Sequence, residues 1–333
     1  MDEKNVYQDI AAAFEYITGE EIVKAVPIRR GWMNKKWKVS TVSGDYFLKQ
    51  LHQDRYRSQD REDLLYALKL QQLLQHIGFP CPELIGDPIH LSSKKESFVI
   101  MTFSEGETLS PESFEVPHMK ELGTYTAAMH NLLNCGRAER LPKKTAWVPE
   151  SRSERAGHWK NVMAGVRSDG NTELLPIIDH QLSALENIDP QQFTNCPKGW
   201  AHRDLWTDNL LFQGAGLSAI LDFDRMRFDT LLLDVGRAII SCSLDSDGSF
   251  RYSLAEAFFD AYQEEIPLES HMLELALKMI WYMESPWWIH SRTNSLNTTA
   301  ARFAAEMEWL AGWISSGQPL KCYANYKEPA REA

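Results

Sequence analysis

The chain has 333 residues, of which 44% are hydrophobic and 24% are charged, a composition typical of an ordinary soluble globular protein with room for two lobes. Its formal net charge of −11 argues against bulk nucleic-acid binding, which needs a basic surface. Because the N-terminus is polar and no run of about 18 apolar residues occurs, we expect no signal segment and no membrane partner, and we predict a cytoplasmic protein.

The N-terminal part of the chain combines helical and strand-like patterns. Apolar residues at helical spacing predict helices over 6–18 and 60–76. Between them, short apolar runs predict strands over 22–28, 37–42 and 46–49. This part is therefore expected to hold a small sheet with accompanying helices.

The C-terminal part is expected to be mainly helical. Helical spacing predicts helices over 119–133 and 174–188. The segment 138–172 is rich in charge, Pro, Gly and Ser, and is interpreted as a connection that holds one short helix. The last dozen residues resemble a loose polar tail.

Five cysteines are scattered along the chain without a Cys-x-x-Cys spacing, namely Cys81, Cys135, Cys196, Cys242 and Cys322. This distribution favours reduced, buried thiols over disulfides or a zinc site. The sequence leaves the oligomeric state open.

The most informative segment is His202–Asn209, which Leu221–Asp224 follows after a short interval. Two strand-like runs with a Gly-rich turn between them predict a hairpin that folds Asp222 back beside Asn209. Phosphoryl transfer from ATP needs a carboxylate that accepts or orients the proton of the attacking hydroxyl, and oxygen ligands that hold metal ions on the phosphates. We therefore predict Asp204 as the base.

The metal ligands are predicted to be Asn209 and Asp222, with Asp224 as a second metal contact or a brace. Either motif alone has a plain structural explanation, since His-x-Asp is common and Asp-Phe-Asp could be a solvated loop. The two together, with the asparagine five residues and the first acidic residue 18 residues after Asp204, match a kinase signature.

The chain resembles the aminoglycoside phosphotransferase and choline kinase-like families over about residues 25–265. Further motifs carry this resemblance: Tyr46–Lys49, Gly78–Leu84, Phe98–Leu109, and Asp234 as a brace for the catalytic loop. The resemblance implies an α+β, two-lobed protein-kinase-like fold. Residues 1–103 would form an N-lobe with an antiparallel sheet plus a helix, and residues 104–333 a larger, mainly helical C-lobe.

The resemblance also implies a nucleotide site in the N-lobe. A lysine at a strand end would approach the ATP phosphates, a glutamate of the following helix would pair with it, and a strand with a hinge would hold adenine. A short Gly-x-x-Asn turn would cover the phosphates, although it could equally be a plain hairpin. The residues concerned are Gly31, Asn34, Lys49, Glu62, Met101 and Phe103.

The implied activity is transfer of the γ-phosphate of ATP, with Mg²⁺, to a hydroxyl of a small molecule. Amino alcohols, choline-like amines, sugars and aminoglycosides all remain open as acceptors. Two other hypotheses remain: a protein Ser/Thr kinase and a non-catalytic member of the fold. With Arg203 the motif reads His-Arg-Asp, as it does in protein kinases. However, too few residues separate Asp222 from Asp234 to hold an activation loop.

Acceptor contacts are predicted at Trp206 and Asp208 in the catalytic loop and at an aromatic concentration near the C-terminus, Trp281, Trp287 and Trp288. Aromatic faces can bind a protonated or quaternary amine by cation–π attraction. The alternative is an ordinary helix-bundle core rich in tryptophan. The run 234–266 also resembles homoserine kinases of this fold.

Overall fold

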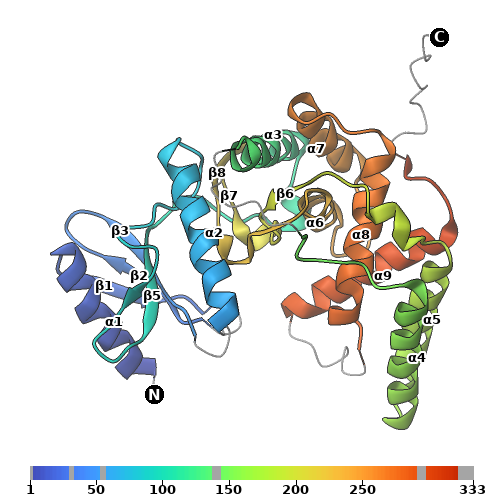
Figure 1. The fold of residues 1–333 in the computed structure, drawn as a ribbon, viewed down its shortest axis with the longest axis horizontal. Helices are drawn as coiled ribbons and strands as arrows, with labels where there is room; N and C mark the ends of the chain where they lie inside the picture. Colours follow the sequence, from blue (N-terminus) through green and yellow to red (C-terminus); the bar gives the residue numbers. More distant parts are fainter. Residues whose placement is uncertain (1–2, 30–33, 53–57, 137–143, 291–297, 322–333) are drawn as a thin grey trace. The chain divides into compact units, whose positions relative to one another are not determined.

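The structure is a computed structural model that describes residues 3–29, 34–52, 58–136, 144–290 and 298–321 (Figure 1). Its contacts divide the chain into two compact units. The first unit comprises the chain up to residue 107 together with 209–227, and the second comprises 108–208 and 228–333. The lobe boundary between residues 103 and 104 stays a prediction. The return of 209–227 to the first unit has no counterpart in the expected boundaries.

An antiparallel five-stranded sheet forms the centre of the first unit, in the order β1-β2-β3-β5-β4. Its strands are β1 (Lys24–Pro27), β2 (Lys36–Ser40), β3 (Asp45–Gln50), β4 (His90–Leu91) and β5 (Ser97–Thr102). Two helices accompany the sheet, α1 (Glu3–Thr18) and α2 (Ser58–His76). The predicted strands and both predicted helices are confirmed, with bounds that differ by a few residues.

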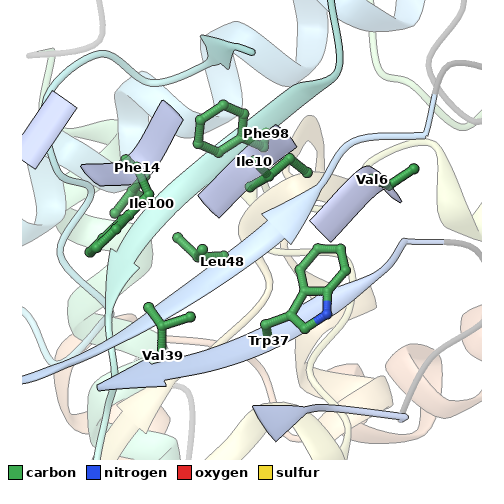
Figure 2. Close-up of a cluster of buried hydrophobic side chains, with 8 residues drawn as sticks. All are labelled: Val6, Ile10, Phe14, Trp37, Val39, Leu48, Phe98 and Ile100. Atoms are coloured by element: carbon green, nitrogen blue, oxygen red, sulfur yellow. The ribbon is translucent and has the colours of Figure 1, made fainter. Parts of the chain in front are cut away.

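The two helices cover opposite faces of this sheet, as the alternation of side chains along β5 shows. Phe98 and Ile100 join a core beneath α1, whose other members are Val6, Ile10, Phe14, Trp37, Val39 and Leu48 (Figure 2). Val99 and Met101 point the other way and pack with Leu51, Leu64, Leu68 and Leu84, of which two lie on α2. Burial of one such side chain stabilises a fold by about 1.5–3 kcal/mol, so the strand alternation fixes both helices.

A hairpin of β7 (Leu210–Gln213) and β8 (Gly216–Ile220) completes the first unit. The hairpin itself is confirmed, whereas its membership of this unit was not predicted. Its Phe212 exchanges two backbone hydrogen bonds with Glu107, at 2.9 and 3.0 Å. The preceding Gly106 has φ +130°, and a Cβ there would lie 2.4 Å from Ser218 Oγ. Only glycine therefore allows the chain to pass so close to the hairpin.

The second unit is mainly helical, with one small sheet of β6 (Lys198–Ala201) and β9 (Arg227–Thr230). Its helices are α3 (Val116–Asn134), α4 (Arg152–Ser168), α5 (Leu175–Glu186), α6 (Leu232–Ser243), α7 (Tyr252–Glu265), α8 (His271–Trp288) and α9 (Thr298–Ser316). The helices predicted over 119–133 and 174–188 are confirmed as α3 and α5.

The short helix expected within 138–172 is wrong in length, because α4 spans 17 residues. A capping box of Ser151 and Glu154 begins it. Only Arg155, Trp159 and Val166 are buried along it, so the apolar periodicity that marks a helix in a sequence is weak here.

Within the described part of the chain, no helix combines the length and the hydropathy needed to cross a bilayer. The four described cysteines are free thiols. Cys196 and Cys242 are buried, as predicted, whereas Cys135 is exposed. Burial raises the pKa of the Cys242 thiol to about 12, which makes this thiol chemically inert at neutral pH. Cys322 lies outside the described residues.

Candidate active site

Strands β7 and β8 bring the two predicted metal ligands to one end of a hairpin. Leu210 pairs with Ile220, and one step further the amide of Leu221 donates to the carbonyl of Asn209 over 2.8 Å. Asn209 directly precedes β7, and Asp222 directly follows this last hydrogen bond. Leu221 is therefore the residue opposite Asn209, and Asp222 lies one residue beyond it at the same end of the hairpin. That the two side chains converge on one metal ion stays a prediction.

Lys49, on the face of β3 opposite to Leu48, is the only described lysine that is 2% exposed or less. Its Nζ lies 2.6 Å from Asp222 Oδ1 and 2.6 Å from Asp224 Oδ2. A buried ammonium is unfavourable unless it is paired, so these two carboxylates explain why the lysine can be buried. Lys36 on β2 adds a second positive charge, 4.0 Å from the other carboxylate oxygen of Asp222.

The backbone at Asp222 is left-handed, with φ 62° and ψ 61°. Residues other than glycine adopt this region rarely, at a cost of about 1–3 kcal/mol, and such positions concentrate at functional sites. The residue begins the short 3₁₀ turn Phe223–Arg225, which holds Asp224 with only 5% of its surface exposed. The strained turn therefore presents both carboxylates to Lys49.

The donor set suits a hard divalent cation. Asn209, Asp222 and Asp224 offer only oxygen ligands, which Mg²⁺ and Ca²⁺ prefer. The two carboxylates already converge on one cationic atom, the Lys49 nitrogen, so they can share a cation. Among the residues that the structure describes, no group of three or more His, Cys, Asp or Glu side chains forms a potential metal site. Mg²⁺ in proteins commonly takes one or two carboxylates and completes its coordination with phosphate and water oxygens.

Residues 202–208, which contain the predicted base and which we call the catalytic loop on that prediction, belong to the second unit and are held by Asp234 of α6. The Asp234 carboxylate accepts the backbone N–H groups of His202 and Arg203, both at 2.6 Å, and lies 2.9 Å from His130 Nε2. Burial alone would raise the pKa of Asp234, but His130, His202 and these amide bonds outweigh it and hold the pKa below its usual range. Asp234 thus braces the loop as an anion.

Arg203 is the second residue of the site with a left-handed backbone, at φ 68°. Its guanidinium pairs with Asp229 of β9 and lies 3.0 Å from Met283 Sδ on α8. The predicted base, Asp204, comes next and is half-buried. The residue before Asp204 therefore has a strained backbone, and Asp222 itself has one too.

Comparison with known proteins decides the family. The model of the phosphotransferase enzyme family matches residues 24–268. The chain belongs to this family. It is 30% identical over 275 residues to the homoserine kinase of Bradyrhizobium sp. (strain BTAi1), a match that covers 79% of this chain and 78% of that relative. To the homoserine kinase of Gluconacetobacter diazotrophicus it is 26% identical over 247 residues, which covers 72% of each.

Solved structures share the fold of this phosphotransferase. Amicoumacin kinase in complex with AMP-PNP and Ca²⁺ has a TM-score of 0.62 at 14% identity, and the match covers 96% of this chain and 95% of that one. Choline kinase from Cryptosporidium parvum has a TM-score of 0.55 at 16% identity, covering 88% and 90%. The predicted two-lobed kinase-like fold is confirmed, and so is the predicted class of enzyme, an ATP-dependent small-molecule phosphotransferase.

The other nucleotide-site residues predicted for this phosphotransferase stay predictions. Gly31 lies outside the described residues, whereas Asn34 is buried and its Oδ1 accepts the amide of His52 at 3.1 Å. Glu62 is exposed on α2, and the carboxylates that contact Lys49 at 2.6 Å are those of Asp222 and Asp224 instead. Met101 is 9% exposed, and Phe103 lies under Lys38 Nζ, 4.0 Å from its ring centroid.

The predicted acceptor aromatics do not form one group. Trp281 is fully buried, and its Nε1 donates to Gln181 Oε1 at 2.7 Å, as in an ordinary core. Trp287 is 52% exposed. Trp288 stacks on Phe303 at 4.6 Å between ring centroids, and Trp206 meets the same ring at 5.0 Å. Asp208 is half-buried in the catalytic loop.

Sequence reasoning missed the residues of α9 that contact the catalytic loop. Phe303 joins Trp206 to Trp288, and the preceding Arg302 donates to Thr207 Oγ1 at 2.7 Å. The available signal was the spacing of four residues between Arg302 and Glu306. That spacing is common on any helix surface and does not indicate a buried pair.

Proposed function

We propose that this phosphotransferase moves the γ-phosphoryl group of Mg·ATP to a hydroxyl of a small, amine-bearing molecule. The observation that carries the proposal is the position of the Lys49 ammonium, 2.6 Å from the carboxylates of both Asp222 and Asp224. Phosphoryl transfer is mostly positioning and charge stabilisation, so a buried cation beside cation-binding carboxylates is what a triphosphate requires.

Each residue has a defined role in this proposal. Asn209 and Asp222 hold Mg²⁺, with Asp224 as a further contact, and a bound Mg²⁺ offsets charge on the phosphate oxygens. Lys49 donates to the α- and β-phosphates. Asp204 accepts the hydroxyl proton while the new O–P bond forms and the bond to ADP breaks. Met101 and Phe103 are proposed to lie along the adenine ring.

Homoserine is the first acceptor to test, because the curated relatives reported above are named homoserine kinases. It offers a primary hydroxyl together with an ammonium and a carboxylate group. Choline and the aminoglycosides, which are named for structural neighbours, share only the cationic nitrogen. The three acceptors therefore separate recognition of an amino acid from recognition of an amine alone.

A coupled assay of ADP release with homoserine, serine, choline, ethanolamine, sugars and aminoglycosides tests the proposal. The inactive control is Asp204→Asn, which keeps the size of the side chain but removes its basicity. We expect acceptor-dependent release by the wild type and little by the control. A folded protein that releases no ADP with any small acceptor, but labels a protein panel, would establish the protein-kinase alternative instead.

A further inference from the structure

Within the second unit, Arg302 of helix α9 contacts the catalytic loop and belongs to a set of paired charged side chains. Arg302 donates through Nη1 to Thr207 Oγ1 at 2.7 Å, and through Nη2 to the carbonyl oxygen of Ser241 and to its Oγ at 3.1 Å. Its Nε lies 3.3 Å from Glu306 Oε1. Every nitrogen of this guanidinium therefore has a polar neighbour, in the planar geometry that arginine imposes.

Further ion pairs link Glu306 of α9 to a side chain of α6 and, through it, to one of α8. Glu306, 2% exposed, also accepts Arg237 Nη2 from α6, and Arg237 Nη1 donates to Glu284 of α8 at 2.8 Å. Burial alone would lower the pKa of Arg237, but Glu306 and Glu284 outweigh it and raise the pKa above its ordinary value. We call Arg237, Glu284, Arg302 and Glu306 the charge network. Its two cations and two anions balance.

Helix α6 thus holds both ends of the catalytic loop, and α9 adds a second attachment at the C-terminal end. Asp234 holds the amides of His202 and Arg203 at the N-terminal end. At the other end Thr207 is 1% exposed, and its amide donates to Ser241 Oγ at 3.2 Å while its hydroxyl accepts Arg302. Asp204 lies between these two attachments.

We propose that Arg302 is a positioning residue for phosphoryl transfer, because it fixes the catalytic loop through Thr207 and so fixes Asp204. The inference rests on the proposed function, which makes Asp204 the base. Buried ion pairs are often no more stabilising than apolar side chains of similar volume, so stability alone is a weak reason for this network. A displacement of about 1 Å at a reacting group can lower a rate by about 10², so holding the loop has a direct effect on turnover.

The test uses variants that remove the contact without changing the shape of the loop. Thr207→Val replaces the hydroxyl with a methyl group and should lower kcat roughly 10- to 100-fold, with the KM for ATP changed by less than about twofold. Thr207→Ser keeps the hydroxyl and should restore most of kcat. Arg302→Met should match Thr207→Val, and the double variant should be no worse than either, because one contact is lost only once. An unchanged kcat in Thr207→Val, or losses that multiply in the double variant, would overturn the inference.

Hydrogen exchange, read by mass spectrometry, keeps the outcome separate from the proposed function because it needs no turnover. In Arg302→Met the peptide that contains residues 202–208 should exchange faster, while the peptide over α7, 252–265, should be unchanged. If no acceptor is phosphorylated, faster exchange confined to the loop still supports the positioning contact. Equal exchange in the loop, or a uniform rise along the chain, contradicts it.

Discussion

At the scale of single residues, charge and backbone strain act together at Asp222. The left-handed backbone at φ 62° is unfavourable by itself, but it directs a carboxylate to within 2.6 Å of the Lys49 ammonium. Aspartate is one of the few residues other than glycine that reach this region, because its short side chain bonds locally. Side-chain chemistry and backbone tolerance therefore select the same residue.

Replacing Asp222 by alanine should abolish metal-dependent nucleotide binding. The change removes the Asp222 carboxylate from Lys49 and leaves the contact of that lysine with Asp224 in place. Titration calorimetry of Mg·ATP should show no measurable heat, whereas Asp260→Ala, an exposed change on α7, should bind normally. Normal Mg·ATP affinity in Asp222→Ala would remove Asp222 from the metal site.

Replacing Asp204 by asparagine should separate binding from turnover. A positioned base contributes about 10² to 10⁴ in rate, so kcat should fall at least about 10²-fold while ATP affinity stays nearly the same. Steady-state kinetics on the best acceptor, with calorimetry for ATP, measures both quantities. Full turnover in this variant would mean that another group accepts the proton.

At the scale of elements, close helix packing depends on glycines that no sequence pattern singled out. A Cβ at Gly123 of α3 would lie 2.3 Å from Phe258 O of α7, and one at Gly236 of α6 would lie 2.4 Å from Ala276 O of α8. Both contacts are with backbone atoms, so the helices themselves must move to admit a methyl group. These two glycines therefore set the spacing of α3 with α7 and of α6 with α8.

Gly236→Ala should destabilise the second unit, and Gly157→Ala should not. Overpacking typically costs about 1–3 kcal/mol. Nothing lies within 4 Å of the position of a Cβ at Gly157, so alanine there should stabilise α4 by about 0.5–1 kcal/mol through its better helix propensity. In thermal unfolding, the Tm should fall in Gly236→Ala and rise in Gly157→Ala. A stable Gly236→Ala variant would show that α6 and α8 can separate without loss.

The Asp234 brace predicts a pH dependence of stability with a defined sign. Because its pKa is lowered in the folded state, the ionised carboxylate stabilises the fold above the unfolded-state pKa of about 3.9, and this contribution is lost as the pH falls through the folded value. Asp234→Asn removes that dependence. The difference in free energy of unfolding between the wild type and Asp234→Asn should therefore be largest near neutral pH and shrink below about pH 4. Denaturant titrations across this range measure it, and a constant difference would exclude ionisation as the cause.

Local patterns in the sequence predicted the helices and strands better than the long-range contacts between them. The hairpin that carries Asn209 and Asp222 was predictable, because two short apolar strands and the Gly-rich turn between them are encoded within a dozen residues. The link between Arg302 and Thr207 was not, because it joins residues 95 positions apart through side chains that look like surface charge. The length of α4 was underestimated because its buried side chains are few.

At the scale of the whole molecule, the chain crosses between its two units several times. The segment 209–227 belongs to the unit of the sheet, while the catalytic loop just before it and Asp234 after it belong to the other. The proposed metal ligands and the proposed base are therefore attached to different units, although only five residues separate Asp204 from Asn209. A sequence motif of this kind does not reveal that a unit boundary passes through it.

Metal and nucleotide together should stabilise the protein more than either alone. A ligand that binds only the folded state at about 100 times its Kd adds about 2.7 kcal/mol. The triphosphate and the carboxylates of Asp222 and Asp224 are all negative and repel each other. The first unit should therefore gain this stabilisation only when a cation bridges the triphosphate and the carboxylates. Thermal unfolding should therefore show a raised Tm with ATP and Mg²⁺, little change with ATP and a chelator, and little change with Mg²⁺ alone. The Asp222→Ala variant should lose the joint effect, and an equal rise with ATP in the presence of the chelator would show that the nucleotide binds without the proposed metal.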